Sequence, residues 1–182
     1  MSKRTLAYGL LCCAALLLAA CGTTPTPLPL PTGVPVPTAS AGAYEPLPAA
    51  ECTALHEDVA AVLGVPLEQT TGPFVDYIAG ESGTCCQLAA TGTGATLGSE
   101  LAVTSNLQFL LEDQGWIVDM QYAAGGPTGS AFGMRQDERL ALVSVMWTPS
   151  ADANCPDDQP ISACNLKPEQ MLFTIIVQAA QK

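Results

Sequence analysis

The sequence predicts an α+β fold: a two-layer sandwich in which two helices cover one face of a mainly antiparallel sheet of about five strands, in the order αββαβββ. Two observations support this class. Segments near residues 52–63 and 103–115 carry apolar residues at helical spacing, whereas the segments after them alternate apolar and polar residues or form short apolar runs. Because short turns join consecutive extended segments, we expect antiparallel pairing, with the two amphipathic helices covering one face.

The first predicted helix has five apolar residues on one face: Cys52, Leu55, Val59, Val62 and Leu63. It should end at about Leu63 because Gly64 and Pro66 follow, and Thr53 is suited to cap its start.

The second predicted helix has four apolar residues on one face: Val103, Leu107, Leu110 and Leu111. Its start lies between Ser99 and Ser105. Ser105 and Gln108 have the spacing of a capping box, and Gly115 is suited to end the helix.

Six segments are predicted as strands: 74–79, 84–90, 116–122, 130–135, 140–147 and 171–178. The polar residues at 80–83 and 136–139 predict hairpins. Residues 116–122 are included because they alternate apolar and polar side chains, so the predicted strand count is approximate. Two glycine-containing segments are predicted as loops. Segment 92–98 lacks the spacing of a dinucleotide-binding motif, and segment 123–130 is suited to be a contact loop.

The composition is acidic. The 182 residues include 17 Asp or Glu and 6 Lys or Arg, with a formal net charge of −11 and a pI near 4.1. Nucleic-acid binding requires clustered basic residues, so nucleic acid is excluded as an expected partner.

The first twenty residues have the layout of a secretory signal peptide. Lys3 and Arg4 precede an uncharged segment, 6–20, that is short for a transmembrane helix, and no stop-transfer charges follow it. We therefore expect residues 1–20 to be a cleaved signal.

The end of this signal, Leu18-Ala19-Ala20-Cys21, resembles the lipobox of bacterial lipoproteins. The resemblance implies cleavage before Cys21 and acylation of that cysteine on its thiol and its amine. Several acyl chains give stable anchoring, so the implied location is the cell membrane or the outer membrane, with the domain facing the periplasm or the cell exterior. The membrane, reached through this lipid anchor, is the one partner implied.

Residues 21–48 are predicted to be the lipidated cysteine and a Pro/Thr-rich linker, since eight prolines lie between residues 22 and 48. Alternating proline favours polyproline II, which could hold a domain up to about 80 Å from the membrane. A single ectodomain should then occupy residues 49–182.

Five cysteines follow the lipidated one: Cys52, Cys85, Cys86, Cys155 and Cys164. In an exported chain, disulfides are expected. Cys155 and Cys164 flank a short loop and are predicted to pair. Cys85 and Cys86 are adjacent in a strand and point to opposite faces. Because Cys86 shares its face with apolar residues, we pair it with Cys52 and leave Cys85 as a free thiol; the reverse choice stays open.

Neither a metal site nor a catalytic site is predicted, and no cofactor is expected. His56 is the only histidine, and Ala60 stands where a zincin motif requires a second one. Asp152, Asp157 and Asp158 could supply oxygen ligands to calcium, although their spacing does not match an EF-hand loop.

The sequence therefore predicts a membrane-anchored lipoprotein acting as a non-catalytic binding or interaction module of unknown ligand. Two alternatives remain. A small-molecule carrier would have an enclosed apolar pocket between the helices and the sheet. A hydrolase using carboxylates alone would have two or more acidic groups with raised pKa in a cleft.

Overall fold

The computed structural model describes residues 40–156 and 159–182. The predicted signal peptide, Cys21 and most of the predicted linker lie outside the described residues, as do Asp157 and Asp158.

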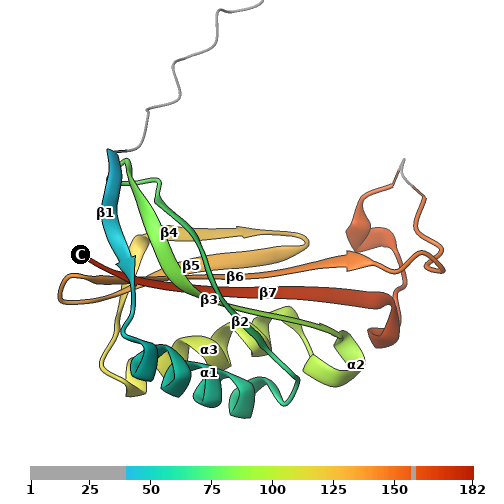
Figure 1. Cartoon of the computed structure of the whole chain (residues 1–182). Coiled ribbons are helices and arrows are strands. Elements are labelled where there is room, and N and C mark those ends of the chain that lie inside the picture. Colours follow the sequence, from blue (N-terminus) through green and yellow to red (C-terminus); the bar gives the residue numbers. More distant parts are fainter. Residues whose placement is uncertain (1–39, 157–158) are drawn as a thin grey trace, which may run out of the picture. The chain divides into compact units, whose positions relative to one another are not determined.

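The α+β class is confirmed, but the predicted count and order of strands are wrong. The described residues form seven strands and three α-helices in one mixed sheet domain (Figure 1). The elements are β1 (Ser40–Pro46), α1 (Ala49–Leu63), β2 (Glu68–Asp76), β3 (Glu81–Thr93), α2 (Gly94–Leu97), α3 (Glu100–Asp113), β4 (Ile117–Gly126), β5 (Gly129–Gln136), β6 (Arg139–Pro149) and β7 (Met171–Gln181). The strand order across the sheet is β2-β3-β1-β7-β6-β5-β4.

Strand β1 corrects the predicted boundary of the domain. It lies within the segment 21–48 that was predicted to be linker, so the folded domain begins before residue 49. β1 runs parallel to β3 and antiparallel to β7, and it lies between these two strands at one end only, because β3 and β7 pair directly further along. Its Tyr44 is buried, and so is Leu47 after it. The prolines before this strand made it read as linker. Pro46 is the last residue of the strand, so its missing amide interrupts no further pairing.

A glycine in β3 permits this insertion. A Cβ atom on Gly83 would lie 2.0 Å from the carbonyl oxygen of Tyr44. The close approach of the two backbones therefore requires glycine at this position.

The ends of several helices and loops differ from those predicted from the sequence. Helix α1 begins at Ala49, and Thr53, predicted as its N-cap, lies inside it and donates to the Ala49 carbonyl. Helix α3 is capped by Ser99, which accepts from the Ala102 amide. The predicted loop 92–98 contains the short helix α2, and the predicted loop 123–130 narrows to the turn between β4 and β5.

The β2–β3 hairpin also differs from the prediction. Strand β2 starts at Glu68 and ends at Asp76, so Tyr77 to Gly80 form the turn rather than the end of a strand. The tip of this hairpin and β1 rise away from the helices (Figure 1).

The helices cover one face of the sheet (Figure 1). The larger hydrophobic core fills the layer between the helices and the sheet. Its members come mainly from α1, α3 and strands β3, β5, β6 and β7, and they include Leu55, Val59, Leu107, Val143 and Ile175. Within the described residues, no helix has the length and apolar character needed to cross a membrane.

The helix-free face carries a second, smaller core. It consists of Tyr44, Phe74, Cys85, Leu140 and Ala180, with Ala43, Tyr122 and Leu142 packed against it. This cluster joins residues from both edges of the sheet, because Phe74 lies on β2 and Tyr122 on β4. The sheet is therefore curved, and its concave side faces away from the helices.

Candidate functional site

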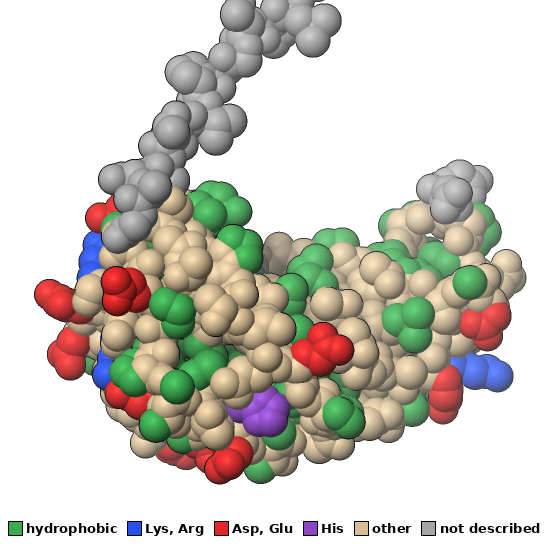
Figure 2. All heavy atoms as spheres, in the orientation of Figure 1, with side chains coloured by type: hydrophobic (Ala, Val, Ile, Leu, Met, Phe, Trp, Pro, Cys, Tyr) green, Lys and Arg blue, Asp and Glu red, His purple; other side chains and the backbone are tan. Residues whose placement is uncertain are grey.

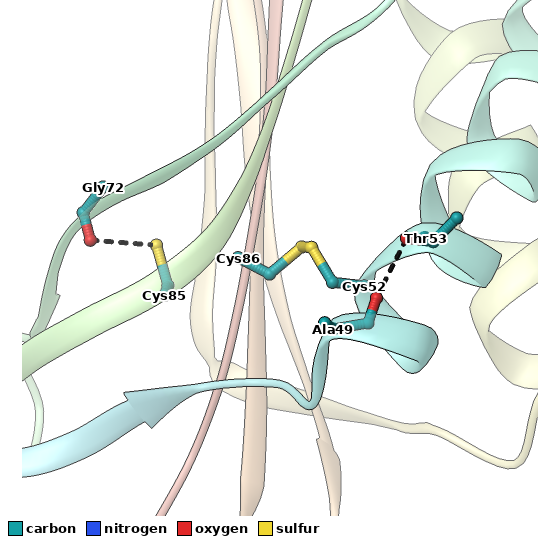
Figure 3. The surroundings of a disulfide bond; sticks show 6 residues. All are labelled: Ala49, Cys52, Thr53, Gly72, Cys85 and Cys86. Carbon is teal, nitrogen blue, oxygen red and sulfur yellow. Dashed lines mark hydrogen bonds between the residues drawn. A yellow bond between two sulfur atoms is a disulfide. The ribbon is translucent and has the colours of Figure 1, made fainter.

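The cysteines lie on both faces of the sheet. Cys52 at the start of α1 forms a disulfide with Cys86 on β3, while Cys85 points the other way and donates to the Gly72 carbonyl at 3.6 Å (Figure 3). A second disulfide joins Cys155 to Cys164. These are the pairs that the sequence predicts. Cys85 has no disulfide partner and is fully buried, and burial raises the pKa of its thiol to about 11. It is therefore not a reactive thiolate at neutral pH.

Asp76 is the centre of a hydrogen-bond network on the helix-free side. It is 0% exposed and is the one polar or charged residue in the buried part of the described structure. Its Oδ1 accepts from the Tyr122 hydroxyl at 2.7 Å and from the amides of Ile78 and Ala79, both at 3.0 Å. Its Oδ2 accepts from the Tyr44 hydroxyl at 2.9 Å. One carboxylate therefore joins β1, β4 and the β2–β3 turn.

Arg135 on β5 completes this network. Its Nη2 donates to the Tyr122 hydroxyl oxygen at 2.6 Å and lies 3.7 Å from Asp76 Oδ2, while its Nε donates to Asp119 at 2.8 Å. The buried carboxylate is thus compensated by a cation and by four donors. Burial of a charge is tolerated only when it is paired and hydrogen-bonded in this way.

The pKa shifts in this network follow from the contacts. Burial alone would raise the pKa of Asp76, but hydrogen bonds from Ala79, Tyr122, Tyr44 and Ile78 outweigh it and leave this pKa below its ordinary value. Burial and the neighbouring Asp76 carboxylate raise the pKa of both tyrosines. Asp76 is therefore ionised and both phenols are neutral at physiological pH, which is unsuited to general acid catalysis by Asp76.

The position of Tyr122 depends on the curvature of β4. The register between β4 and β5 shifts between Asp119 and Ala124, which is a bulge-like irregularity. Tyr122 lies in this stretch and packs over Gly133 of β5, where an added Cβ would be 2.6 Å from the Tyr122 Cβ. The glycine thus makes room for the tyrosine, whose hydroxyl can then reach Asp76.

A shallow depression lies on the same face, with a volume of about 240 Å³. Its floor is formed by β5, β6 and β7, and its lining includes Ala131, Leu142, Ser144, Ile176 and Gln178. Tyr122 and Tyr77 line it as well, one from each edge of the sheet. Tyr77 is 83% exposed, which is unusual for a large aromatic side chain.

Three acidic residues that line other surface depressions, Glu51, Asp58 and Asp152, are already engaged. A surface groove contains Glu51 and Asp58, but Glu51 forms an ion pair with Arg139 at 2.7 Å and Asp58 accepts from Gln114 at 2.8 Å. Asp152 accepts from Ser150, and this hydrogen bond lowers its pKa. In the described part of the chain, no three His, Cys, Asp or Glu residues cluster as a metal site would require.

Sequence reasoning missed the whole helix-free site. Asp76, Tyr77, Tyr122 and Arg135 lay in predicted strands, but no spacing links them, since their contacts span up to 59 positions between Asp76 and Arg135. One signal was available: an Asp at the start of a turn commonly accepts from amides two and three residues later. This pattern predicts the turn after Asp76 but does not predict that Tyr44 and Tyr122 contact its carboxylate.

Comparisons of the chain with protein-family models, with curated proteins and with solved structures find no match. What the site can do is therefore inferred from its own residues and contacts.

Proposed function

We propose that the protein is a lipid-anchored extracytoplasmic lipoprotein whose domain is a non-catalytic binding module, and that it binds through the helix-free face of its sheet. The observation that carries this proposal is the exposed Tyr77 beside an apolar depression on a face that no helix covers.

The anchor rests on the lipobox-like Leu18-Ala19-Ala20-Cys21 and on the Pro/Thr-rich segment after it. Two disulfides in the domain suit an oxidising compartment outside the cytoplasm. The acidic surface, on which red side chains are more widespread than blue ones in Figure 2, would be repelled by anionic lipid headgroups. This charge favours a domain that stands off the membrane on its linker.

The binding role rests on how rigidly the face is built. Binding residues work best when other contacts fix their positions. Here Asp76 holds Tyr122 through its hydroxyl and holds the turn that carries Tyr77 through the amides of Ile78 and Ala79. The ionised state of Asp76 and its engaged oxygens are consistent with a supporting role.

The anchor is tested by metabolic labelling with radioactive palmitate in a bacterial host. The intact chain should incorporate label and sediment with membranes, whereas Cys21→Ala should incorporate none. Cys85→Ala is the matched control and should label normally, because its thiol is buried in the domain. Label on the Cys21→Ala variant would overturn the anchor assignment.

The binding face is tested in the same cells by a photoreactive p-benzoylphenylalanine placed at position 77. Irradiation should give an adduct of defined mass. The same group at position 109 is the control, because Phe109 is also an exposed aromatic, 60% accessible, but lies on α3. Equal adduct yields at the two positions, or none at position 77, would overturn the assignment of the helix-free face.

A further inference from the structure

We propose that the depression on the helix-free face binds a neutral, flat ring compound of one or two fused rings, held between Tyr77 and Tyr122. This inference rests on the proposed function, because it names the ligand class for the same face.

The shape of the depression fits a flat ring. Sheet register places Ala131 opposite Ser144, Ser144 opposite Ile176, and Leu142 opposite Gln178, so small and branched side chains form a nearly continuous floor across three strands. The two tyrosines stand at its sides. Aromatic rings favour offset or edge-to-face contacts with other rings, and an exposed tyrosine offers such a contact at small entropic cost.

The volume sets the size of the ligand. An apolar cavity of about 150 Å³ accommodates benzene. At about 240 Å³, the depression is larger than that but smaller than the roughly 300 Å³ at which sites for drug-sized ligands begin. One ring or two fused rings therefore fit.

The charges around the depression select a neutral ligand. Its lining contains no Asp, Glu, Lys, Arg or His. An anion would be repelled by the acidic chain, whose formal net charge is −11. A cation that stacked on Tyr122 would be repelled by the guanidinium of Arg135, which already lies 5.4 Å from the ring centroid of this tyrosine. The neutral form is the one that no nearby charge opposes.

Polar groups at the margin can orient such a ligand. Gln178 donates its amide group to the Pro73 carbonyl and to Gln87 Oε1, which fixes its side chain. Its own Oε1 is left as an acceptor, and the Ser144 hydroxyl can donate or accept. A ring that bears one N–H or O–H group would find a partner in either side chain.

The test uses methyl NMR on the intact chain, processed and held in lipid nanodiscs, with ¹³C-labelled isoleucine δ1 methyl groups. Ile176 lies on the floor of the depression and reports binding, while the adjacent Ile175 points into the opposite core and is an internal control. Indole is the probe, with tryptamine as its cationic analogue and indole-3-acetate as its anionic analogue.

Indole should shift the Ile176 methyl signal saturably, with a dissociation constant on the order of 1 mM for so small a ligand on an open site. Ile175 should not move. Tyr77→Ala should weaken indole binding about tenfold, whereas Phe109→Ala should leave it unchanged. Both variants should fold, because Tyr77 and Phe109 are exposed.

Three results would overturn the proposal: no saturable shift of Ile176, equal binding by the Tyr77→Ala variant, or tighter binding of tryptamine than of indole. The photoreactive adduct at position 77 separates this failure from failure of the proposed function. If the adduct forms but indole does not bind, the face is still a binding surface and only the ligand class is wrong. If no adduct forms, both the proposed function and this inference are wrong.

Discussion

The two faces of the sheet are stabilised by different kinds of interaction. The helix-covered face packs apolar side chains and a disulfide between sheet and helices. The helix-free face has only a small apolar cluster, and its curvature is tied to hydrogen bonds around one buried carboxylate. Apolar packing tolerates exchange of one apolar residue for another of similar size, whereas a buried charge depends on each specific partner. Substitution of a single polar group should therefore lower stability on the helix-free face more than a similar-sized apolar exchange lowers it on the helix-covered face.

The largest effect should come from removing the Cys52–Cys86 disulfide on the helix-covered face. The two residues are 34 positions apart, and a loop of that length corresponds to about 4 kcal/mol of stabilisation in the chain-entropy model. We expect the Cys52→Ala, Cys86→Ala double variant to lose roughly this much free energy of unfolding in a urea titration. Removing Cys155 and Cys164 by the same substitutions should cost less, about 2.5 kcal/mol, because their separation is 9. A larger loss of stability from removing Cys155 and Cys164 than from removing Cys52 and Cys86 would contradict this prediction.

The next effect concerns the neighbouring thiol on the other face. Burial raises the pKa of Cys85 from 9.0 to about 11, which lowers its thiolate fraction near neutral pH about a hundredfold. Iodoacetamide should therefore modify Cys85 at least a hundredfold more slowly than it modifies free cysteine, as followed by intact mass, and denaturant should restore the rate. Rapid alkylation of the folded protein would show that the small core opens readily.

A smaller effect is expected from Asp76→Asn, which keeps the size of the side chain and removes its charge. Hydrogen bonds to a charged group contribute about 1.5–3 kcal/mol, so we expect a loss near 2 kcal/mol in the same urea titration. Asp119→Asn is the matched control. Asp119 pairs with the same Arg135 but is partly exposed, so its loss should be about 1 kcal/mol or less. Equal losses for the two variants would mean that Asp76 does not organise this face.

The smallest and most specific effect is a pH dependence. Because hydrogen bonds lower the pKa of Asp76 in the folded state, the unfolded chain binds the proton more tightly. The stabilisation is complete above the unfolded pKa, about 3.9, and is lost as the pH falls through the lower folded-state value. The free energy of unfolding should fall less steeply below pH 4 in Asp76→Asn than in the unchanged chain. Parallel slopes would contradict this assignment.

Most of the helix-covered face could be predicted from local sequence. The helical spacing of Leu55 and Val59 in α1, and of Val103 and Leu107 in α3, marks residues that face the sheet. Gly64, with φ at 65°, marks where α1 ends. The opposite orientation of Cys85 and Cys86 follows from strand geometry alone. β1 was not predicted because it pairs with distant strands and directly follows a proline-rich segment.

The sequence by itself determined the α+β class, the two helices that face the sheet, and the opposite orientation of Cys85 and Cys86, because these depend on periodicity within short segments. Only the tertiary structure decided that seven strands curve into one sheet and that Tyr44, Tyr122 and Arg135 converge on Asp76. The physical reason is that strand order and curvature are set by contacts between residues far apart in the chain. No local pattern records which tyrosine will reach a buried carboxylate from the opposite edge of a sheet.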